Sequence, residues 1–468
     1  MNKCVTINKK DNVCVTIDGY GNVPPGHKIA LTRIEKGDRV IKYGEPIGVA
    51  TKTIEKGEWV HTHNLRSALD ESTDLRYDGG FAPRTPGEIG KFKGYLRPNG
   101  TAGIRNDIYV IPTVGCVNGV CRRIAALSQK YVRGSIDGVF ALTHQFGCSQ
   151  LGEDAENIGA LIASIALNPN ASRVLIVGLG CENNAIAGIE ARLKPYNYGN
   201  IAFMNCQNEE DEIAKGLGMI ERFADEIKDS ERTEVTLDKL RVGLKCGGSD
   251  GFSGIIANPL VGKFTDMLVR SGGSAVLTEI PETFGAEKVV GKKCENEAVF
   301  DAFAQTVNEY KKAYSDSGYP VYENPSPGNK AGGITTLEEK SLGCVEKAGS
   351  TAITDVIRYG ERAKKSGVTV LAAPGNDLIA ATALGAAGCQ IVLFTTGRGT
   401  PFSTFVPTLK IASNTPLAIR KSNWIDFNAD GADENALWQK TLATVNGDYK
   451  CKSESEREIA FYKKGVTL

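Results

Sequence analysis

Several common functional signatures are missing from this 468-residue sequence. It contains no CxxC pair, which removes support for zinc-ribbon and thioredoxin-type sites. It contains no GxxxxGK[ST] loop, which argues against a P-loop nucleotide site. Its longest apolar stretches, such as 161–167 and 174–177, are far shorter than the ~18 residues of a membrane span. These absences favour a protein that acts on small molecules away from the bilayer.

The sequence also lacks a net charge and an N-terminal apolar segment. Its 55 basic residues balance 55 acidic ones, so the electrostatic footprint of a nucleic-acid or anionic-lipid binder is missing. The stretch MNKCVTINKKDNVC offers no apolar core for a secretory signal. We therefore expect a cytoplasmic protein whose 12 cysteines are reduced, with small molecules or copies of itself as partners.

The hydrophobic pattern divides the chain into four parts. Residues 1–66 read as short strands separated by glycine turns, which predicts an all-β module. Residues 67–97 collect Pro, Gly and charge, as linkers do. Apolar runs then alternate with helical stretches in two blocks, 98–235 and 236–468. This alternation predicts an α/β fold with parallel sheets, whose strand ends are where ligands bind.

Cysteines at strand ends form the first candidate site. Cys148, Cys181 and Cys246 each follow an apolar run and lie in a glycine-containing turn, and Cys344 lies in KSLGC. Soft thiolates converging on one crevice would favour iron or an iron–sulfur cluster. The alternative is that they are buried cysteines that serve as small hydrophobic residues.

Histidine and carboxylate residues form the competing candidates. Only four histidines occur, and strand alternation would place His61 and His63 on one face. Asp250, Glu279 and Glu282 lie in strand-end loops and suit a hard divalent ion. Arg398, between two glycines, is free to clamp a carboxylate. Asp377 is a candidate cap for its own helix.

A dinucleotide site receives little support. GLGCEN at 178–183 begins like a dinucleotide fingerprint, but Asn183 stands where its third glycine should be. An NAD-dependent dehydrogenase is therefore only a third-ranked interpretation.

A dense set of motifs resembles the altronate and galactarate dehydratase family. They run from about Lys28 to Gly431 and include GHKIAL, GYLRPNGTAGIRN, HQFGCSQ, GLGCE, CGGSDGFSGIIANPLVG, TEIPETFGAE, KAGGITTLEEKSLGC, FTTGRGTPF and WIDFNADG. The stretches TTGRGTPF and WIDFNA look more like altronate than galactarate dehydratases. Ser403 and Thr404 stand where a glycine is expected.

The resemblance implies an architecture and an activity. It implies an N-terminal β-clip module of the SAF type, a linker, a middle domain that mediates dimerisation and a Rossmann-like C-terminal domain. It also implies a hydro-lyase that depends on Fe²⁺ or a similar divalent ion and converts D-altronate to 2-keto-3-deoxy-D-gluconate. Mn²⁺ and an iron–sulfur cluster are the alternative cofactors. The alternative functions are galactarate dehydratase, sulfolactate sulfo-lyase and a non-enzymatic sugar-acid binding protein.

The chemistry of dehydration suggests roles for particular residues. Removing a proton next to a carboxylate creates a dianionic enediolate that needs cations, and a base with a near-neutral pKa. We assign proton transfer to His61, His63 and His144, with the β-module closing as a lid. Lys28, Asn64 and Arg398 are the expected substrate contacts. The expected metal ligands are Cys148, Cys181, Cys246 and Cys344, with His61, Asp250, Glu279 and Glu282 as the alternative set.

Overall fold

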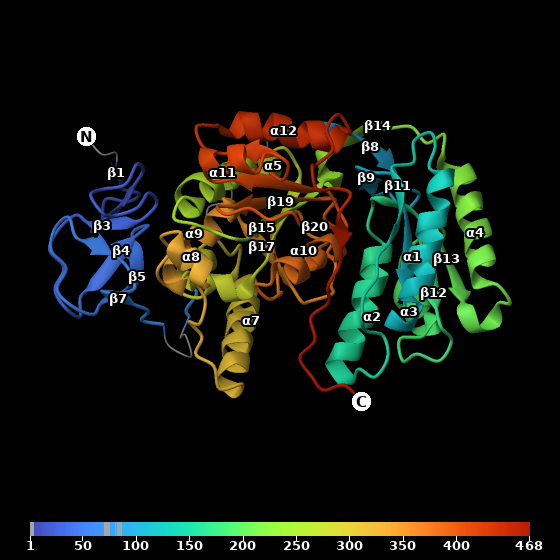
Figure 1. Cartoon of the computed structure of the whole chain (residues 1–468), viewed down its shortest axis with the longest axis horizontal. Helices are drawn as coiled ribbons and strands as arrows, with labels where there is room; N and C mark the ends of the chain where they lie inside the picture. Colours follow the sequence, from blue (N-terminus) through green and yellow to red (C-terminus); the bar gives the residue numbers. More distant parts are fainter. Residues whose placement is uncertain (1–3, 70–74, 80, 82–86) are drawn as a thin grey trace.

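The structure is a computed structural model that describes residues 4–69, 75–79, 81 and 87–468. The predicted linker 67–97 therefore lies partly outside the described residues. Across the molecule, the C-terminal α/β domain lies between the N-terminal β module and the middle α/β domain (Figure 1).

The N-terminal module is built from antiparallel strands, as predicted. One sheet has the order β1-β2-β3-β6, and the other has the order β4-β5-β7. Their bounds are β1 (Cys4–Val5), β2 (Val13–Thr16), β3 (Lys28–Ala30), β4 (Arg39–Lys42), β5 (Glu45–Ala50), β6 (Trp59–Val60) and β7 (Leu65–Arg66). The expectation that all thiols are reduced is wrong at one place. Cys4 and Cys14 form a disulfide, because the antiparallel pairing of β1 with β2 brings these two residues together.

The middle domain has a parallel sheet with the order β11-β10-β12-β13. The strands are β10 (Asp107–Pro112), β11 (Gly138–Ala141), β12 (Ala171–Gly178) and β13 (Ile201–Asn205). The helices are α1 (Asn118–Leu127), α2 (Gly152–Ala166), α3 (Ile186–Leu193) and α4 (Glu212–Ile227). Side chains alternate between the two faces of β10. Ile108 and Val110 belong to the core that α1 and α4 cover. Tyr109 and Ile111 belong to the core that α2 and α3 cover on the other face. A small antiparallel sheet, β14 (Thr233–Thr236), β8 (Lys91–Leu96) and β9 (Ala102–Gly103), adjoins this domain.

The C-terminal domain contains a seven-stranded parallel sheet with the order β17-β18-β16-β15-β19-β21-β22. The strands are β15 (Arg241–Cys246), β16 (Ser274–Leu277), β17 (Ile353–Ile357), β18 (Gly367–Leu371), β19 (Ile391–Thr396), β21 (Thr408–Ala412) and β22 (Phe427–Asn428). The helices are α5 (Asn258–Arg270), α6 (Glu287–Gly291), α7 (Glu297–Asp316), α8 (Pro327–Ala331), α9 (Leu337–Val345), α10 (Asp377–Ala386), α11 (Thr415–Arg420) and α12 (Glu434–Asn446). The helix predicted from Asp377 begins there, but Asn376 caps it by accepting a hydrogen bond from the amide of Ile379.

Two features join the α/β domains. One apolar core is shared between them, since Ile158 and Leu161 of α2 belong to the same cluster as Val276 and Leu371 of the C-terminal sheet. In addition, β23 (Arg457–Glu458) pairs with β20 (Ser403–Thr404). Beyond β23 the chain returns to the middle domain, and its end lies beside α2 (Figure 1). There the Leu468 amide donates to the Ser149 carbonyl at 2.9 Å.

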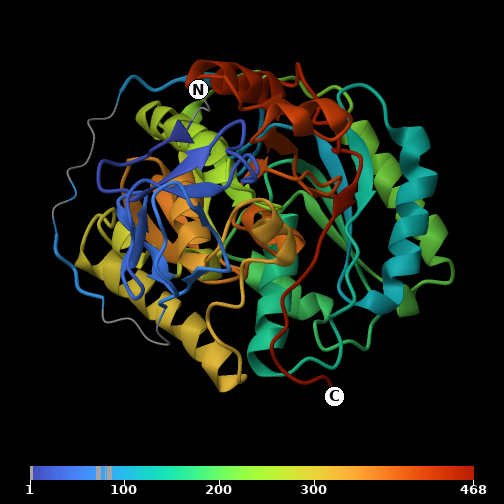
Figure 2. The same cartoon turned by 60° about the vertical axis from the view of Figure 1, so that its left-hand side comes forward.

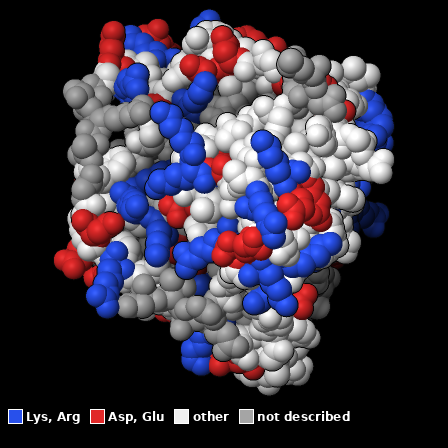
Figure 3. All heavy atoms as spheres, turned by 90° about the vertical axis from the view of Figure 1, so that its left-hand side faces the viewer, with Lys and Arg blue, Asp and Glu red and all other residues white. Residues whose placement is uncertain are grey.

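The N-terminal module lies over the C-terminal domain (Figure 2). A buried ion-pair triad connects them, because Glu339 of α9 accepts hydrogen bonds from Lys28 and Lys42, both at 2.8 Å. The outward face of the molecule at this end carries Lys and Arg interspersed with Asp and Glu (Figure 3). Ion pairs of the N-terminal module include Arg33–Glu35 and Lys52–Glu58. Among the described helices, none combines the length and the apolar character needed to cross a membrane.

Candidate active site

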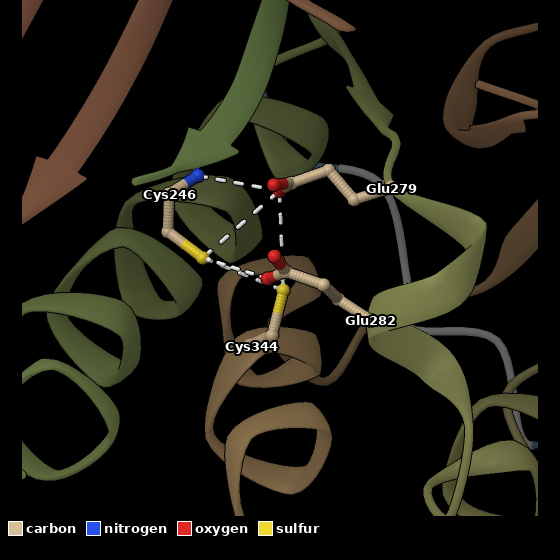
Figure 4. A group of neighbouring side chains, drawn as sticks. All are labelled: Cys246, Glu279, Glu282 and Cys344. Carbon is tan, nitrogen blue, oxygen red and sulfur yellow. Dashed lines mark hydrogen bonds between the residues drawn. The ribbon is translucent and has the colours of Figure 1, made fainter. Parts of the chain in front are cut away.

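A buried group of thiols and carboxylates lies at the carboxyl edge of the C-terminal sheet. Cys246 ends β15, Glu279 and Glu282 follow β16, and Cys344 lies on α9 (Figure 4). One donor atom from each residue lies within 4.8 Å of the others, and all four residues are buried. Glu279 has a φ of 74°, a left-handed conformation that is strained for a residue with a Cβ and that often marks functional sites.

Three lysines surround this group: Lys245 and Lys347 are buried, and the Lys340 side chain is 10% exposed. The Lys245 ammonium contacts Glu279, the Lys340 ammonium lies 2.8 Å from Glu282, and the Lys347 ammonium donates to the Cys344 sulfur at 2.9 Å. If both thiols were ionised, the group would carry four negative charges against three positive ones. The surroundings can therefore accept a further cation without a large excess of positive charge.

The environment drives the pKa values within the group apart. Burial and repulsion from Glu282 raise the pKa of Glu279 well above its ordinary value. Burial acts against the charge of Glu282, but Lys340 and Lys245 outweigh it and lower the pKa of this carboxyl. The hydrogen bond shared by the two thiols lowers the pKa of Cys246 and raises that of Cys344. Neighbouring groups with separated pKa values are suited to proton transfer.

The donor set fits a divalent metal ion. Metal–ligand distances of about 2.0–2.3 Å place tetrahedral donors about 3.3–3.8 Å apart. The Cys246 sulfur lies 3.5 Å from the Cys344 sulfur and 3.5 Å from a Glu282 oxygen, and 4.0 Å from a Glu279 oxygen. Small shifts would bring all four donors into range. Mixed thiolate and carboxylate ligands suit a borderline divalent transition metal.

A solvent-facing pocket lies on the same edge of the sheet. This pocket of about 290 Å³ is lined by Pro25, Asp250, Phe252, Gly332, Gly397, Arg398 and Arg420. Asp250 also lines a narrow cavity that reaches Cys246 and Lys340. The two guanidinium groups can bind a carboxylate, and Asp250 lines both this pocket and the narrow cavity.

The alternative metal set is only partly assembled. Glu279 and Glu282 belong to the buried group, but Asp250 does not, because its oxygens accept hydrogen bonds from Ser253, Ser413 and Asn414. His61 is also outside the group. Its Nε2 lies 2.9 Å from the Lys330 carbonyl, which joins the N-terminal module to α8.

The histidines of the N-terminal module gather around Trp59 rather than along a strand. The expected shared strand face is wrong, since β6 ends at Val60 and residues 61–64 form a turn. His61 packs against His27 with ring centres 5.2 Å apart, while His63 is exposed and packs on Trp59. Burial followed by repulsion from His61 lowers the pKa of His27 to about 4.

Two expected substrate contacts are buried in structural roles. The Lys28 ammonium is fully buried and bonds Glu339, Thr335 and the Gly333 carbonyl. Asn64 closes the histidine turn by accepting from the His61 amide and donating to the Trp59 carbonyl. Of the three expected contacts, only Arg398 lines the pocket.

The remaining predicted residues lie in the middle domain. His144 is buried, and both of its ring nitrogens are used: Nε2 bonds the Pro112 carbonyl and Nδ1 accepts from the Phe146 amide. Cys148 and Cys181 are exposed on strand-end loops of the middle sheet. The expected four-thiol set is therefore not one group, because the chain forms two parallel sheets with separate carboxyl edges.

Comparison with known proteins gives these groups a family context. Three family models match the chain: the SAF domain of altronate/galactarate dehydratases over 17–68, the second domain of D-galactarate dehydratase/altronate hydrolase over 94–228, and the C-terminal domain of D-galactarate/altronate dehydratase over 237–467. The chain belongs to the altronate/galactarate dehydratase family.

Curated relatives agree with this assignment. The altronate dehydratase of Bacillus subtilis is 45% identical over the whole of both chains. That of Escherichia coli is 45% identical over 98% of this chain and 94% of its own. The galactarate dehydratase (L-threo-forming) of Escherichia coli is 30% identical over 91% of this chain and 87% of its own.

Within this dehydratase, sequence reasoning missed the lysines of the buried group. Lys245 lies in the apolar strand sequence RVGLKC, and a charged residue inside such a run is the signal that could have revealed it. Lys340 and Lys347 flank Cys344 at helical spacing. Arg420, the second guanidinium of the pocket, ends α11 and carries no local signal.

Proposed function

We propose that this chain dehydrates D-altronate to 2-keto-3-deoxy-D-gluconate and water. The observation that carries the proposal is the position of Arg398 and Arg420, which line a pocket that shares Asp250 with the narrow cavity reaching Cys246. Full-length identity to altronate dehydratases supports this substrate over galactarate.

The proposed reaction begins with binding of the substrate carboxylate. Arg398 and Arg420 hold it at the pocket mouth, which directs C2 and C3 toward Asp250 and the buried group. A base removes the proton from C2, and its bonding electrons form a C2–C3 double bond as the C3 hydroxyl departs. That hydroxyl takes a proton and leaves as water, and the resulting enol becomes the 2-keto acid. A high pKa at Glu279 suits a group that supplies such a proton.

The groups that move protons are part of the proposal. His61 and His63 remain our candidates in the N-terminal module, which contributes Pro25 to the pocket. His144 is a weaker candidate, because both its nitrogens are bonded to backbone groups. Cys246, Glu279, Glu282 and Cys344 are the proposed ligands of a ferrous ion, which when bound would stabilise the negative charge that develops on the substrate.

A direct assay tests this proposal. The iron-loaded protein is incubated without oxygen with altronate, galactarate and sulfolactate, and keto-deoxy acid and sulfite are measured. Keto-deoxy acid from altronate, at a kcat/KM at least tenfold above that from galactarate, is expected. Sulfite release from sulfolactate alone would instead indicate a sulfo-lyase, and no product from any substrate would contradict the assignment.

Architectural details complete the proposal. We divide the chain into a β-clip module (1–66), a linker (67–97), a middle domain (98–235) and a C-terminal domain (236–468). Apart from its edge strand β17, the C-terminal sheet has the strand order 3-2-1-4-5-6 of Rossmann folds, which supports a Rossmann-like description. A homodimer formed through the middle domain is expected, and light scattering after gel filtration would measure its mass.

A further inference from the structure

The exposed cysteines gather at one edge of the middle sheet. Among the free cysteines of the described chain, Cys116, Cys148 and Cys181 are the exposed ones. They lie in the loops that follow β10, β11 and β12, which are neighbours in the parallel sheet. Free cysteine is usually buried as a small hydrophobic residue, so its exposure on three adjacent loops calls for a chemical explanation.

Backbone contacts hold these three loops against one another. The Gly115 amide donates to the Phe146 carbonyl at 2.9 Å, which connects the Cys116 loop to the Cys148 loop. The Asn184 amide donates to the Gly147 carbonyl at 3.0 Å, which connects the Cys148 loop to the Cys181 loop. Each thiol is thus carried by a loop that is fixed to its neighbour.

The Cys148 loop is shaped around the Cys116 loop. Gly147 has a φ of 108°, and a Cβ at this position would lie 2.0 Å from the Thr113 carbonyl oxygen. Only glycine permits this approach. Ser149, on the other side of Cys148, also has a left-handed φ of 67° and is held by the Asn183 side chain at 2.8 Å. The backbone on both sides of Cys148 is therefore constrained.

Three cysteine thiols on adjacent loops suit an iron–sulfur cluster, because cysteine thiolates are the usual ligands of such clusters. Across the described residues, the buried group is the one set of three or more potential ligands whose donor atoms lie within 4.8 Å. The three exposed thiols do not form such a set, so they do not share a site for one metal ion as they stand. The buried Asn184 amide nitrogen, which follows Cys181 in the same loop, has no acceptor among the described residues.

We propose that Cys116, Cys148 and Cys181 bind a cubane iron–sulfur cluster at the carboxyl edge of the middle sheet. Two ferrous ions, two ferric ions and four sulfides make up the cube without a change of oxidation state. Each thiol releases its proton as its sulfur bonds to iron, and the fourth iron keeps a position without a cysteine ligand. The site is separate from the Cys246 group and does not depend on the proposed activity.

Anaerobic reconstitution tests the proposal. The full chain is treated with iron salts, sulfide and a thiol reductant, desalted, and analysed for iron, acid-labile sulfide and visible absorption. We expect about four sulfides per chain in the original protein. C116S, C148S and C181S should each lose at least four-fifths of this sulfide. C206S is the matched control, because Cys206 follows β13 on the same edge but is half-buried, and it should retain the cluster.

A second measurement is independent of mutation. Alkylation followed by peptide mass mapping should show Cys116, Cys148 and Cys181 protected at least fivefold by reconstitution. The absence of bound sulfide in the original protein would overturn the proposal, as would equal sulfide loss in C206S. C344S separates this site from the metal proposed above, because it should lower bound iron without lowering sulfide.

Discussion

Glu339 provides the sharpest test of how the N-terminal module is held. Its carboxylate is 1% exposed and accepts hydrogen bonds from Lys28, Lys42 and the Thr335 amide, each at 2.8 Å. Glu339→Gln would keep the shape but leave two buried ammonium groups without a counter-charge. Removing one partner of a buried ion pair costs about 3–5 kcal/mol.

The pKa of Glu339 gives a second estimate of this cost. Burial raises the pKa of Glu339, but Lys28 and Lys42 outweigh burial and lower it to about 2 from an ordinary value of 4.5. That difference corresponds to about 3 kcal/mol of stability. Because the folded-state pKa is depressed, this contribution is complete above about pH 4.5 and is lost as the pH falls toward about 2.

Urea denaturation at pH 7 measures the effect. We expect Glu339→Gln to lower the free energy of unfolding by about 3–5 kcal/mol, or to produce a separate early transition of the N-terminal module. Glu338→Gln is the matched control: Glu338 is a buried neighbour on α9 that accepts from Ser67 and the Ala68 amide. Equal losses in the two variants would refute the idea that charge pairing holds the module.

Three further predictions address the pocket, the buried group and the middle domain. Arg398→Ala should raise the KM for altronate about 10- to 100-fold in steady-state assays, with partial recovery in Arg398→Lys; an unchanged KM would remove Arg398 from carboxylate binding. Cys344→Ser should lower the metal content of iron-loaded protein at least fivefold by elemental analysis, whereas Cys389→Ser, at another buried thiol, should not. Burial lowers the pKa of His144 to about 4 from an ordinary value of 6.5. The folded protein therefore holds this imidazole neutral, and its contribution to the free energy of unfolding, up to about 3 kcal/mol, is complete above about pH 6.5 and is lost as the pH falls to about 4. In urea titrations at pH 7, His144→Phe should therefore be less stable than the original protein. Between pH 7 and pH 5, the variant should lose less stability than the original protein does, and equal losses in the two proteins would contradict this.

Much of the fold follows from local patterns in the sequence. The apolar run RVLIV is part of β12, and the helical pattern EAVFDAFAQTVNEYKKAY is part of α7. The rule that parallel strands end at one edge also predicted that Cys246, Glu279 and Glu282 would lie at the carboxyl edge of a sheet, where the structure places them. These successes depend on periodicity and on a general property of parallel sheets.

The failures concern contacts between distant parts of the chain. Strand-end position could not tell that Cys148 and Cys246 belong to different sheets, because that depends on strand order. Strand-end position also could not show that Lys28 forms a buried ion pair with Glu339, which is 311 residues away in the sequence. Long-range pairing of charges is invisible to periodicity, so the substrate contacts were harder to predict than the elements that carry them.

The return of the chain end to the middle domain has a practical consequence for preparing the protein. Because the backbones of Thr467 and Leu468 are joined to those of Gln150 and Ser149, a purification peptide fused after Leu468 would crowd the loop that presents Cys148. Such material would be poorly suited to reconstitution or thiol-labelling work. An affinity peptide placed before the β module would leave that edge of the molecule accessible to reagents.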